Sequence, residues 1–154
     1  MVESIFADLV RVEIQTWNVV DTAVRREAGV SLGDYEGLKV IEDRRTSRVN
    51  QVAEDLVITV GGASKLADRL ERAGLLIRRQ NAEDRRSSVL ELTDHGTAVL
   101  NRAARVVSAE LHRYFDASIT AEELHKLGLT LRKLRKSAAV ATETPSAKSK
   151  LPTN

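Results

Sequence analysis

Small and polar residues gather at the point where the sequence predicts the start of a helix. They are Thr59, Gly61, Gly62, Ser64 and Lys65. A helix that enters the major groove of DNA needs such residues in its first turns, because large apolar side chains neither fit nor hydrogen-bond with base edges. Glycine lets the backbone approach closely, and the free N–H groups of a helix N-terminus can bind a phosphate. This segment is therefore a candidate for contacts with DNA.

Four arginines lie on a predicted β-hairpin that follows this helix. They are Arg78, Arg79, Arg85 and Arg86. Arg86 lies at the hairpin tip, next to Arg85 and close to Asp84, and an arginine on a protruding turn can enter the narrow minor groove, where the potential is most negative. For Arg72 and for the two arginines of the first strand, an ordinary solvated surface is an equally good interpretation, which the sequence leaves open.

The chain before the hairpin shows the pattern of four helices. Apolar residues recur at helical spacing in a long first helix that ends at Gly29. Ser31, Asn50 and Thr59 are suitable N-caps for three shorter helices, and Gly74 ends the last of them. The third and fourth helices are short and nearly contiguous, which makes them a helix-turn-helix candidate.

Two strands and two further helices follow. The strands are expected at Leu75–Gln80 and Ser88–Leu92. Thr93 can cap a fifth helix, and Thr120 with a glutamate three residues later forms a capping box for a sixth. The sixth helix carries leucines at intervals of three, four and three residues: Leu124, Leu127, Leu131 and Leu134. A seam of this regularity requires a helical partner.

The order of these elements predicts a mainly α fold with a small β-hairpin wing. We expect a winged helix-turn-helix over residues 31–93 that binds DNA. Residues 1–30 and 94–137 are expected to form N- and C-terminal dimerisation helices. Residues 138–154 contain few apolar side chains and are expected to form a disordered tail.

Three stretches between residues 52 and 96 match the pattern of a known family. They are Val52-Ala53-Glu54-Asp55-Leu56, the run from Ser64 to Leu75, and Asp84-Arg85-Arg86 followed by Leu90-Glu91-Leu92-Thr93. The last stretch contains the signature D-x-R-x-x-x-L-x-L-T. On these residues the chain resembles the MarR family of transcriptional regulators, and the similarity extends over roughly residues 5–137.

The resemblance implies a homodimer on a pseudo-palindromic operator. It places residues 59–69, which include Arg69, in the major groove and Arg86 in the minor groove. Asp68 and Asp84 would position the wing, Asp68 by pairing with Arg86. The chain departs from the common pattern at Val60-Gly61-Gly62-Ala63, where a polar residue or proline and a threonine are more usual.

Two classes of function follow. The first is a sequence-specific transcriptional regulator, a repressor that a small aromatic effector releases from double-stranded DNA. Trp17 and Tyr35 lie near the predicted meeting point of the first helix and the winged domain, where they either line an effector pocket or pack in the core, the commoner role of such rings. The alternative is a winged-helix module that docks a partner protein with the same face.

The composition argues against other kinds of site. The chain has no cysteine, and its three histidines, His95, His112 and His125, lack the spacing of zinc ligands. No arrangement typical of nucleophilic catalysis or of a phosphate-binding loop is present. We therefore expect no catalytic residue, no metal, no cofactor and no enzyme activity.

Hydropathy indicates where in the cell the protein is located, and the distribution of charge indicates what it binds. No apolar run approaches the roughly 18 residues that a membrane span requires, so we expect a cytoplasmic protein without a membrane partner. The net charge of +2 is unevenly distributed. Residues 1–43 contain four basic and nine acidic residues, whereas residues 44–93 contain ten and seven. The basic segment coincides with the predicted DNA-binding region.

Overall fold

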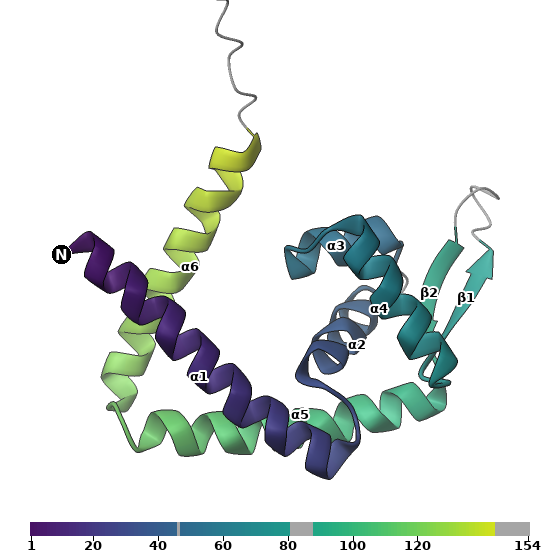
Figure 1. Cartoon of the computed structure of the whole chain (residues 1–154), viewed down its shortest axis with the longest axis horizontal. Helices are drawn as coiled ribbons and strands as arrows, with labels where there is room; N and C mark the ends of the chain where they lie inside the picture. The colour runs from purple at the N-terminus through teal and green to yellow at the C-terminus, as the bar shows by residue number, and fades with distance from the viewer. Residues whose placement is uncertain (46, 81–87, 144–154) are drawn as a thin grey trace, which may run out of the picture. The chain divides into compact units, whose positions relative to one another are not determined.

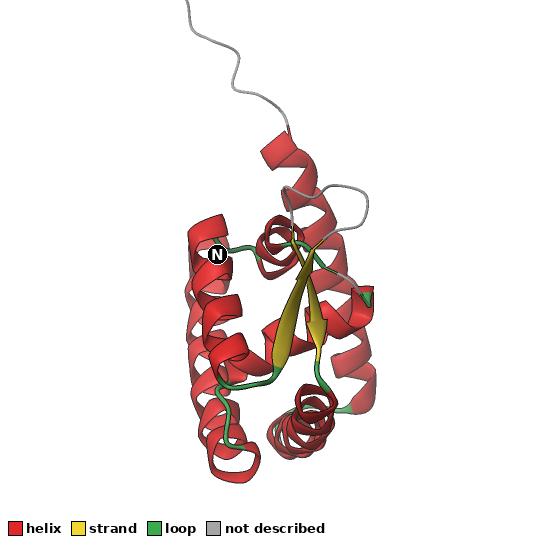
Figure 2. Cartoon of the chain, turned by 90° about the vertical axis from the view of Figure 1, so that its right-hand side faces the viewer, coloured by secondary structure: helices red, strands yellow, loops and turns green. Residues whose placement is uncertain are grey.

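The computed structural model describes residues 1–45, 47–80 and 88–143, with side chains described up to residue 137 (Figure 1). Its elements are α1 (Val2–Ala28), α2 (Leu32–Arg44), α3 (Val49–Leu56), α4 (Val60–Arg72), β1 (Leu76–Gln80), β2 (Ser88–Leu92), α5 (Asp94–Asp116) and α6 (Ala121–Glu143). Residues 1–113 form one compact unit, and the chain from Tyr114 onward belongs to a second. The predicted fold class is confirmed, because helices dominate and the two strands form an antiparallel hairpin (Figure 2).

Four of the predicted helix starts have the expected caps. Ser31 forms a reciprocal capping box with Asp34, and Thr59 Oγ1 accepts a hydrogen bond from the Gly62 amide at 3.0 Å. Thr93 caps α5 through the Gly96 amide, and Thr120 forms its box with Glu123 at the start of α6. These caps hold because the partners are three residues apart and need no tertiary contact.

Two local predictions were wrong. The third helix begins at Val49 rather than after Asn50, because Gln51 Oε1 accepts a hydrogen bond from the Arg48 amide at 2.9 Å and Arg48 takes the cap position. The sixth helix continues to Glu143, so the first six residues of the predicted tail are helical. Alanine is the strongest helix former, and three of those six residues are alanine. Residues 144–154 lie outside the described residues.

Helices α2 and α4 and the two strands share one hydrophobic core. The largest fully buried side chains include Leu38 and Ile41 from α2, Leu70 from α4, and Leu76 and Leu90 from the two strands. The paired strands run from Leu76 opposite Leu92 to Gln80 opposite Ser88. Ser47 forms a single-residue β-bridge with Leu90. Leu90 on β2 is therefore paired on both sides, with Arg78 of β1 and with Ser47. The hairpin is thus fixed at its base to both α2 and α4.

A tight junction links the end of α4 to the base of the hairpin. Gly74 adopts a left-handed φ of 70°, and the Leu75 amide bonds back to the Leu70 carbonyl at 3.0 Å, which is the Schellman ending of a helix. Thr93 Oγ1 donates to the Gly74 carbonyl at 2.7 Å, and the Thr93 amide donates to the Leu75 carbonyl. The start of α5 is therefore attached directly to the end of α4.

Among the residues that the structure describes, no helix combines the length and the apolar character needed to cross a membrane.

Candidate nucleic-acid interface

Helix α4 has one face in the core and the opposite face in solvent. Its buried positions are Ala63, Leu66, Ala67 and Leu70, which recur at helical spacing. The solvent face carries Gly61, Ser64, Lys65, Asp68 and Arg72. Figure 1 shows that the hairpin lies beside α4, so that a surface docking against α4 also meets the hairpin.

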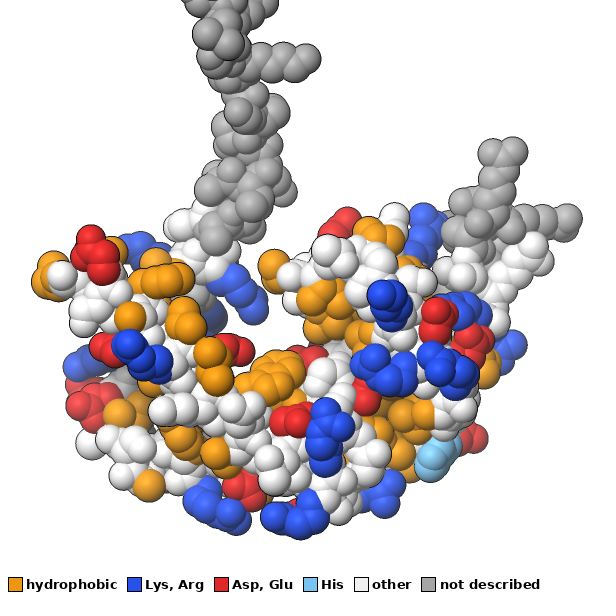
Figure 3. Space-filling view, viewed as in Figure 1, with side chains coloured by type: hydrophobic (Ala, Val, Ile, Leu, Met, Phe, Trp, Pro, Cys, Tyr) orange, Lys and Arg blue, Asp and Glu red, His pale blue; other side chains and the backbone are white. Residues whose placement is uncertain are grey.

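Four of the residues predicted to contact DNA lie together at the N-terminal end of this solvent face. Thr59, Gly61 and Lys65 are exposed, and Ser64 between them is half-buried. A Cβ built at Gly61 meets nothing within 4 Å, so the folded chain does not itself need a glycine there. Figure 3 shows basic and acidic side chains interspersed beside the base of the hairpin.

Gly62 has a different role from Gly61. A Cβ at Gly62 would lie 3.2 Å from Thr59 Oγ1, the atom that accepts the capping hydrogen bond. The contact is tighter than most real Cβ contacts, so a side chain at Gly62 would disturb the cap. We therefore assign Gly62 to the geometry of the helix start and Gly61 to the open surface.

Arg69 faces α2. Its Nε donates to Asp34 Oδ1 at 2.8 Å and its Nη2 lies 2.7 Å from the same oxygen. Asp34 is nearly buried, and its other oxygen, Oδ2, accepts from the Ser31 amide and hydroxyl. The ion pair joins residues that are 35 apart in sequence, so the guanidinium of Arg69, a predicted DNA contact, is held by an acid of its own chain.

The hairpin is held to α4 by a second ion pair. Arg78 on β1 donates to Asp68 Oδ1 at 2.6 Å and to Glu71 Oε2 at 2.5 Å. The hydrogen bond to Asp68 is the largest of the causes that raise the pKa of Arg78 above its ordinary value, so the arginine stays charged. Asp68 thus contacts the wing, with Arg78 as its partner among the described residues. The predicted positions of Asp84, Arg85 and Arg86 lie outside those residues.

Two further ion pairs brace the same unit. Arg44 at the end of α2 binds Asp55 on α3 through both carboxylate oxygens, at 2.5 and 2.9 Å. The hydrogen bond from Arg44 is the main cause that lowers the pKa of Asp55. Arg79 pairs with Glu91 across the two strands at 2.6 Å. The sequence left Arg78 and Arg79 undecided between DNA contact and solvated surface, and both make ion pairs within the chain.

The turn between α3 and α4 contains a strained residue. Val57 adopts the left-handed conformation, with φ 54° and ψ 44°, and its side chain is 88% exposed. A β-branched residue rarely adopts this conformation, which costs it about 1–2 kcal/mol. Glycine is the residue that usually occupies such a turn.

Replacing Val57 with glycine is expected to raise the free energy of unfolding by about 1 kcal/mol, because it removes the strain while little packing is lost from an exposed side chain. Urea denaturation of wild type, Val57→Gly and Val57→Ala checks this. Alanine should stabilise less than glycine, since its Cβ still opposes the left-handed conformation. A loss of stability in Val57→Gly would contradict the assigned turn.

A cavity of about 410 Å³ lies beside the helix-turn-helix. Trp17 from α1, Leu56 and Ile58 from the turn region, and Arg69 from α4 contribute to its walls. Trp17 is 42% exposed and lines the cavity, whereas Tyr35 is buried in the core and does not line it. Burial is the main cause that raises the pKa of Tyr35. Of the two rings predicted near this junction, one faces a cavity and one packs.

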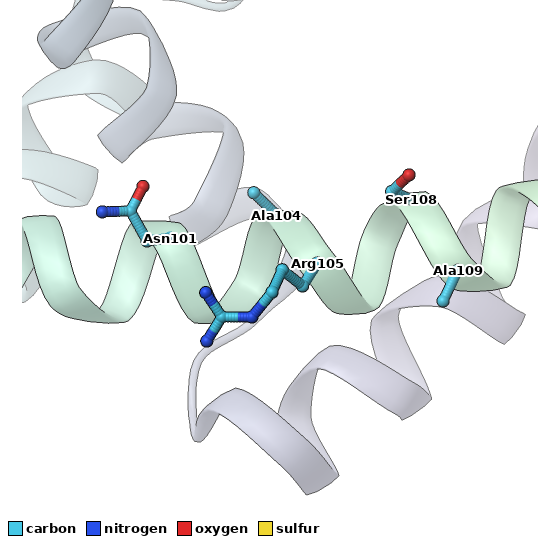
Figure 4. Close-up of a pocket in the computed structure, with 5 residues that line it drawn as sticks. All are labelled: Asn101, Ala104, Arg105, Ser108 and Ala109. Atoms are coloured by element: carbon cyan, nitrogen blue, oxygen red, sulfur yellow. The ribbon is translucent and has the colours of Figure 1, made fainter.

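A second hollow lies along α5. It has a volume of about 610 Å³, and its wall consists of Asn101, Ala104, Arg105, Ser108 and Ala109 (Figure 4). All five residues come from one face of one helix, so the hollow is an open groove that cannot enclose a small ligand.

The three histidines do not form a site. His95 and His112 are exposed on α5, and His125 is exposed on α6. Within the described part of the chain, no group of three or more histidines and acids is placed to hold a metal ion.

Comparison with known proteins shows which family the helix-turn-helix and hairpin region resembles. Residues 30–88 match the model of the MarR family. The HTH-type transcriptional regulator YkoM of Bacillus subtilis is 27% identical over 108 residues, which cover 70% of each chain. The winged region of the chain, residues 30–88, therefore matches the MarR family of transcriptional regulators.

Solved structures of MarR-family proteins share the fold. A mutant of MarR from Escherichia coli, complexed with operator DNA, has a TM-score of 0.79 at 20% identity and covers 85% of this chain and 93% of its own. The PcaV regulator of Streptomyces coelicolor, in complex with its natural ligand, has a TM-score of 0.74 at 22% identity and covers 84% and 90%. At these identities the likeness establishes the fold alone.

Proposed function

We propose that the protein is a sequence-specific DNA-binding repressor that acts as a homodimer on a pseudo-palindromic operator. The observation that carries the proposal is the solvent face of α4, where Thr59, Gly61, Ser64 and Lys65 lie together at the helix N-terminus. The Asp68–Arg78 ion pair fixes the hairpin beside this face. A helix inserted in the major groove with a wing over the adjacent backbone uses this arrangement.

Exposed apolar side chains support the homodimer. On α1 they are Val2, Ile5, Phe6, Leu9, Val10, Val12, Ile14, Trp17 and Val19, and Figure 3 shows such side chains gathered along the N-terminal half of this helix. The α6 seam exposes Leu127, Leu131 and Leu134. A monomer rarely leaves a large apolar surface in water on either helix. Apart from Trp17, which lines the cavity beside the helix-turn-helix, we assign these side chains to contacts with a second copy of the chain, which would fix the spacing of two α4 helices.

The cavity beside Trp17 is the place we assign to a small aromatic effector. Trp17, Leu56 and Ile58 offer apolar contacts, and Arg69 offers a charge. Arg69 also holds α4 to α2 through Asp34, so a ligand that engages Arg69 acts directly on the DNA-facing helix. An effector shifts the protein off DNA only if it binds the non-binding arrangement more tightly. Trp17 is the single tryptophan, so its fluorescence reports occupancy of this cavity.

Selection of bound sequences from random DNA by the purified protein tests the proposal. The account predicts enrichment of an inverted repeat whose half-sites are centred one helical turn, or about 34 Å, apart. Affinity for the selected duplex should fall steeply with salt, because phosphate contacts release counterions. Absence of any enriched sequence, together with tight salt-insensitive binding to a protein, would favour the alternative of a protein-docking module.

Replacing Gly61 with alanine is expected to separate folding from DNA binding. The methyl group has open space in the free chain, and alanine is the better helix former, so stability should rise by up to about 1 kcal/mol. Operator affinity should fall, because the added methyl stands between the backbone and the base edges. Denaturation and gel shift at fixed salt measure the two effects. Unchanged operator affinity would show that α4 does not approach DNA closely at Gly61.

A further inference from the structure

The first turn of α4 has one exposed apolar side chain. Of its first three residues, Val60, Gly61 and Gly62, only Val60 has a side chain, and this side chain is 53% exposed. Thr59 next to it uses its hydroxyl oxygen for the helix cap. Gly61 and Gly62 have no side chain that could cover Val60, which lies at the exposed N-terminus of α4 beside Val57 and Ile58 of the preceding turn.

The fold does not account for a valine at this position. The core contact of this turn is made by Ala63, which is 1% exposed, and Val60 is outside the buried cluster. A β-branched residue lowers helix propensity, and an exposed one adds apolar surface in water. The contribution of Val60 therefore has to come from something that covers it.

The chemistry of the major groove restricts what can cover Val60 favourably. Valine forms no hydrogen bond through its side chain, so a polar base edge pressed against it would lose its water without replacement. The one apolar group on the base edges of the major groove is the 5-methyl of thymine. Resting on the proposed DNA-binding function, we propose that Val60 recognises thymine in each half-site through contact with its 5-methyl group.

This assignment also gives a role to Gly61. With no side chain there, the first turn of α4 can sit deep enough for a short side chain such as valine to reach a methyl group. Lys65, five residues further along α4, is also exposed, and its ammonium group can donate to a guanine or a phosphate. In this proposal the first turn of α4 recognises DNA by shape and by contact with a methyl group. Side chains that can form hydrogen bonds with bases begin one turn later.

The test uses the duplex obtained by selection, with thymine replaced by deoxyuridine one position at a time, which removes only the 5-methyl group. At one symmetric pair of positions we expect about a fourfold loss of affinity for each methyl group, and about fifteenfold when both half-sites are changed. Val60→Ala should bind the thymine and deoxyuridine duplexes equally. Val60→Thr, which keeps the volume but adds a hydroxyl, should lose part of the thymine preference.

The results separate this proposal from the proposed function. If deoxyuridine has no effect at any position while the selected duplex is still preferred over other DNA, methyl recognition is wrong and DNA binding stands. If Val60→Ala weakens both duplexes equally, or weakens neither, Val60 does not read thymine. If no sequence is enriched at all, the DNA-binding function itself fails. Unfolding curves of the two Val60 variants, expected to match wild type, confirm that they are folded.

Discussion

Replacing Leu131 of α6 with glutamate should convert the protein to a monomer and lower operator affinity by at least about 100-fold. Two half-sites held by one dimer gain this much from the second binding event, which a monomer loses. Leu131 lies in the seam of Leu124, Leu127 and Leu134 and is 42% exposed in the single chain. A carboxylate placed there would have to leave water in a seam of leucines, and that burial is unfavourable.

Leu129 provides a matched control for Leu131. It lies on the same helix, is 51% exposed and has the same chemistry, but its angular position around the helix is opposite to the seam. Leu129→Glu should leave the dimer and the operator affinity unchanged within a fewfold. Sedimentation measures the oligomeric state of the two variants, and gel shift measures their operator affinity. A Leu131→Glu protein that remains a dimer with full operator affinity would show that the seam is not the interface.

Replacing Gly96 with alanine is expected to destabilise the folded protein by about 3 kcal/mol or more. A Cβ at Gly96 would lie 1.9 Å from the Leu75 carbonyl oxygen, which belongs to backbone and cannot rotate away. Overpacking in a core usually costs about 1–3 kcal/mol, and a backbone clash lies at or above the upper end of this range. The change acts at the junction where Thr93 holds the end of α4 to the start of α5.

Gly33 is a suitable control for Gly96, because it also lies in the first turn of a helix. Its nearest neighbour is Ser31 Oγ at 3.9 Å from an added Cβ, an ordinary contact. Gly33→Ala should therefore change stability by no more than about 1 kcal/mol, and in the stabilising direction. Urea denaturation of both variants measures the difference. Equal stability of Gly96→Ala and wild type would contradict the close approach of α5 to Leu75.

Most of the elements could be predicted from sequence because their signals are local. Caps such as Ser31 with Asp34 and Thr120 with Glu123 connect residues three apart, and the strands were bounded by a polar turn. The start of α3 was misplaced because two caps competed, and Gln51 favoured Arg48. The extent of α6 was underestimated because composition suggested disorder where alanine supports a helix.

The contacts that shape the candidate site were harder to predict. The capping role of Asp34 follows from its place three residues after Ser31, but nothing in the sequence indicates that it also binds Arg69 on α4. The sequence contains only a weak signal for the ion pair between Arg78 and Asp68, namely two acids, Asp68 and Glu71, three residues apart on one helix face. Identifying Arg78 as their partner requires the register of the hairpin. The strained backbone of Val57 has no sequence signal except the absence of glycine in a tight turn.

The central claim is that the N-terminal end of α4 reads a DNA sequence. The most direct measurement is a fluorescence anisotropy titration of the protein with the selected duplex and with a scrambled duplex of identical composition, at one fixed salt concentration. The account predicts binding to the selected duplex at least about 1,000-fold tighter, the lower end of the range for specific regulators. Equal affinity for the two duplexes would contradict it.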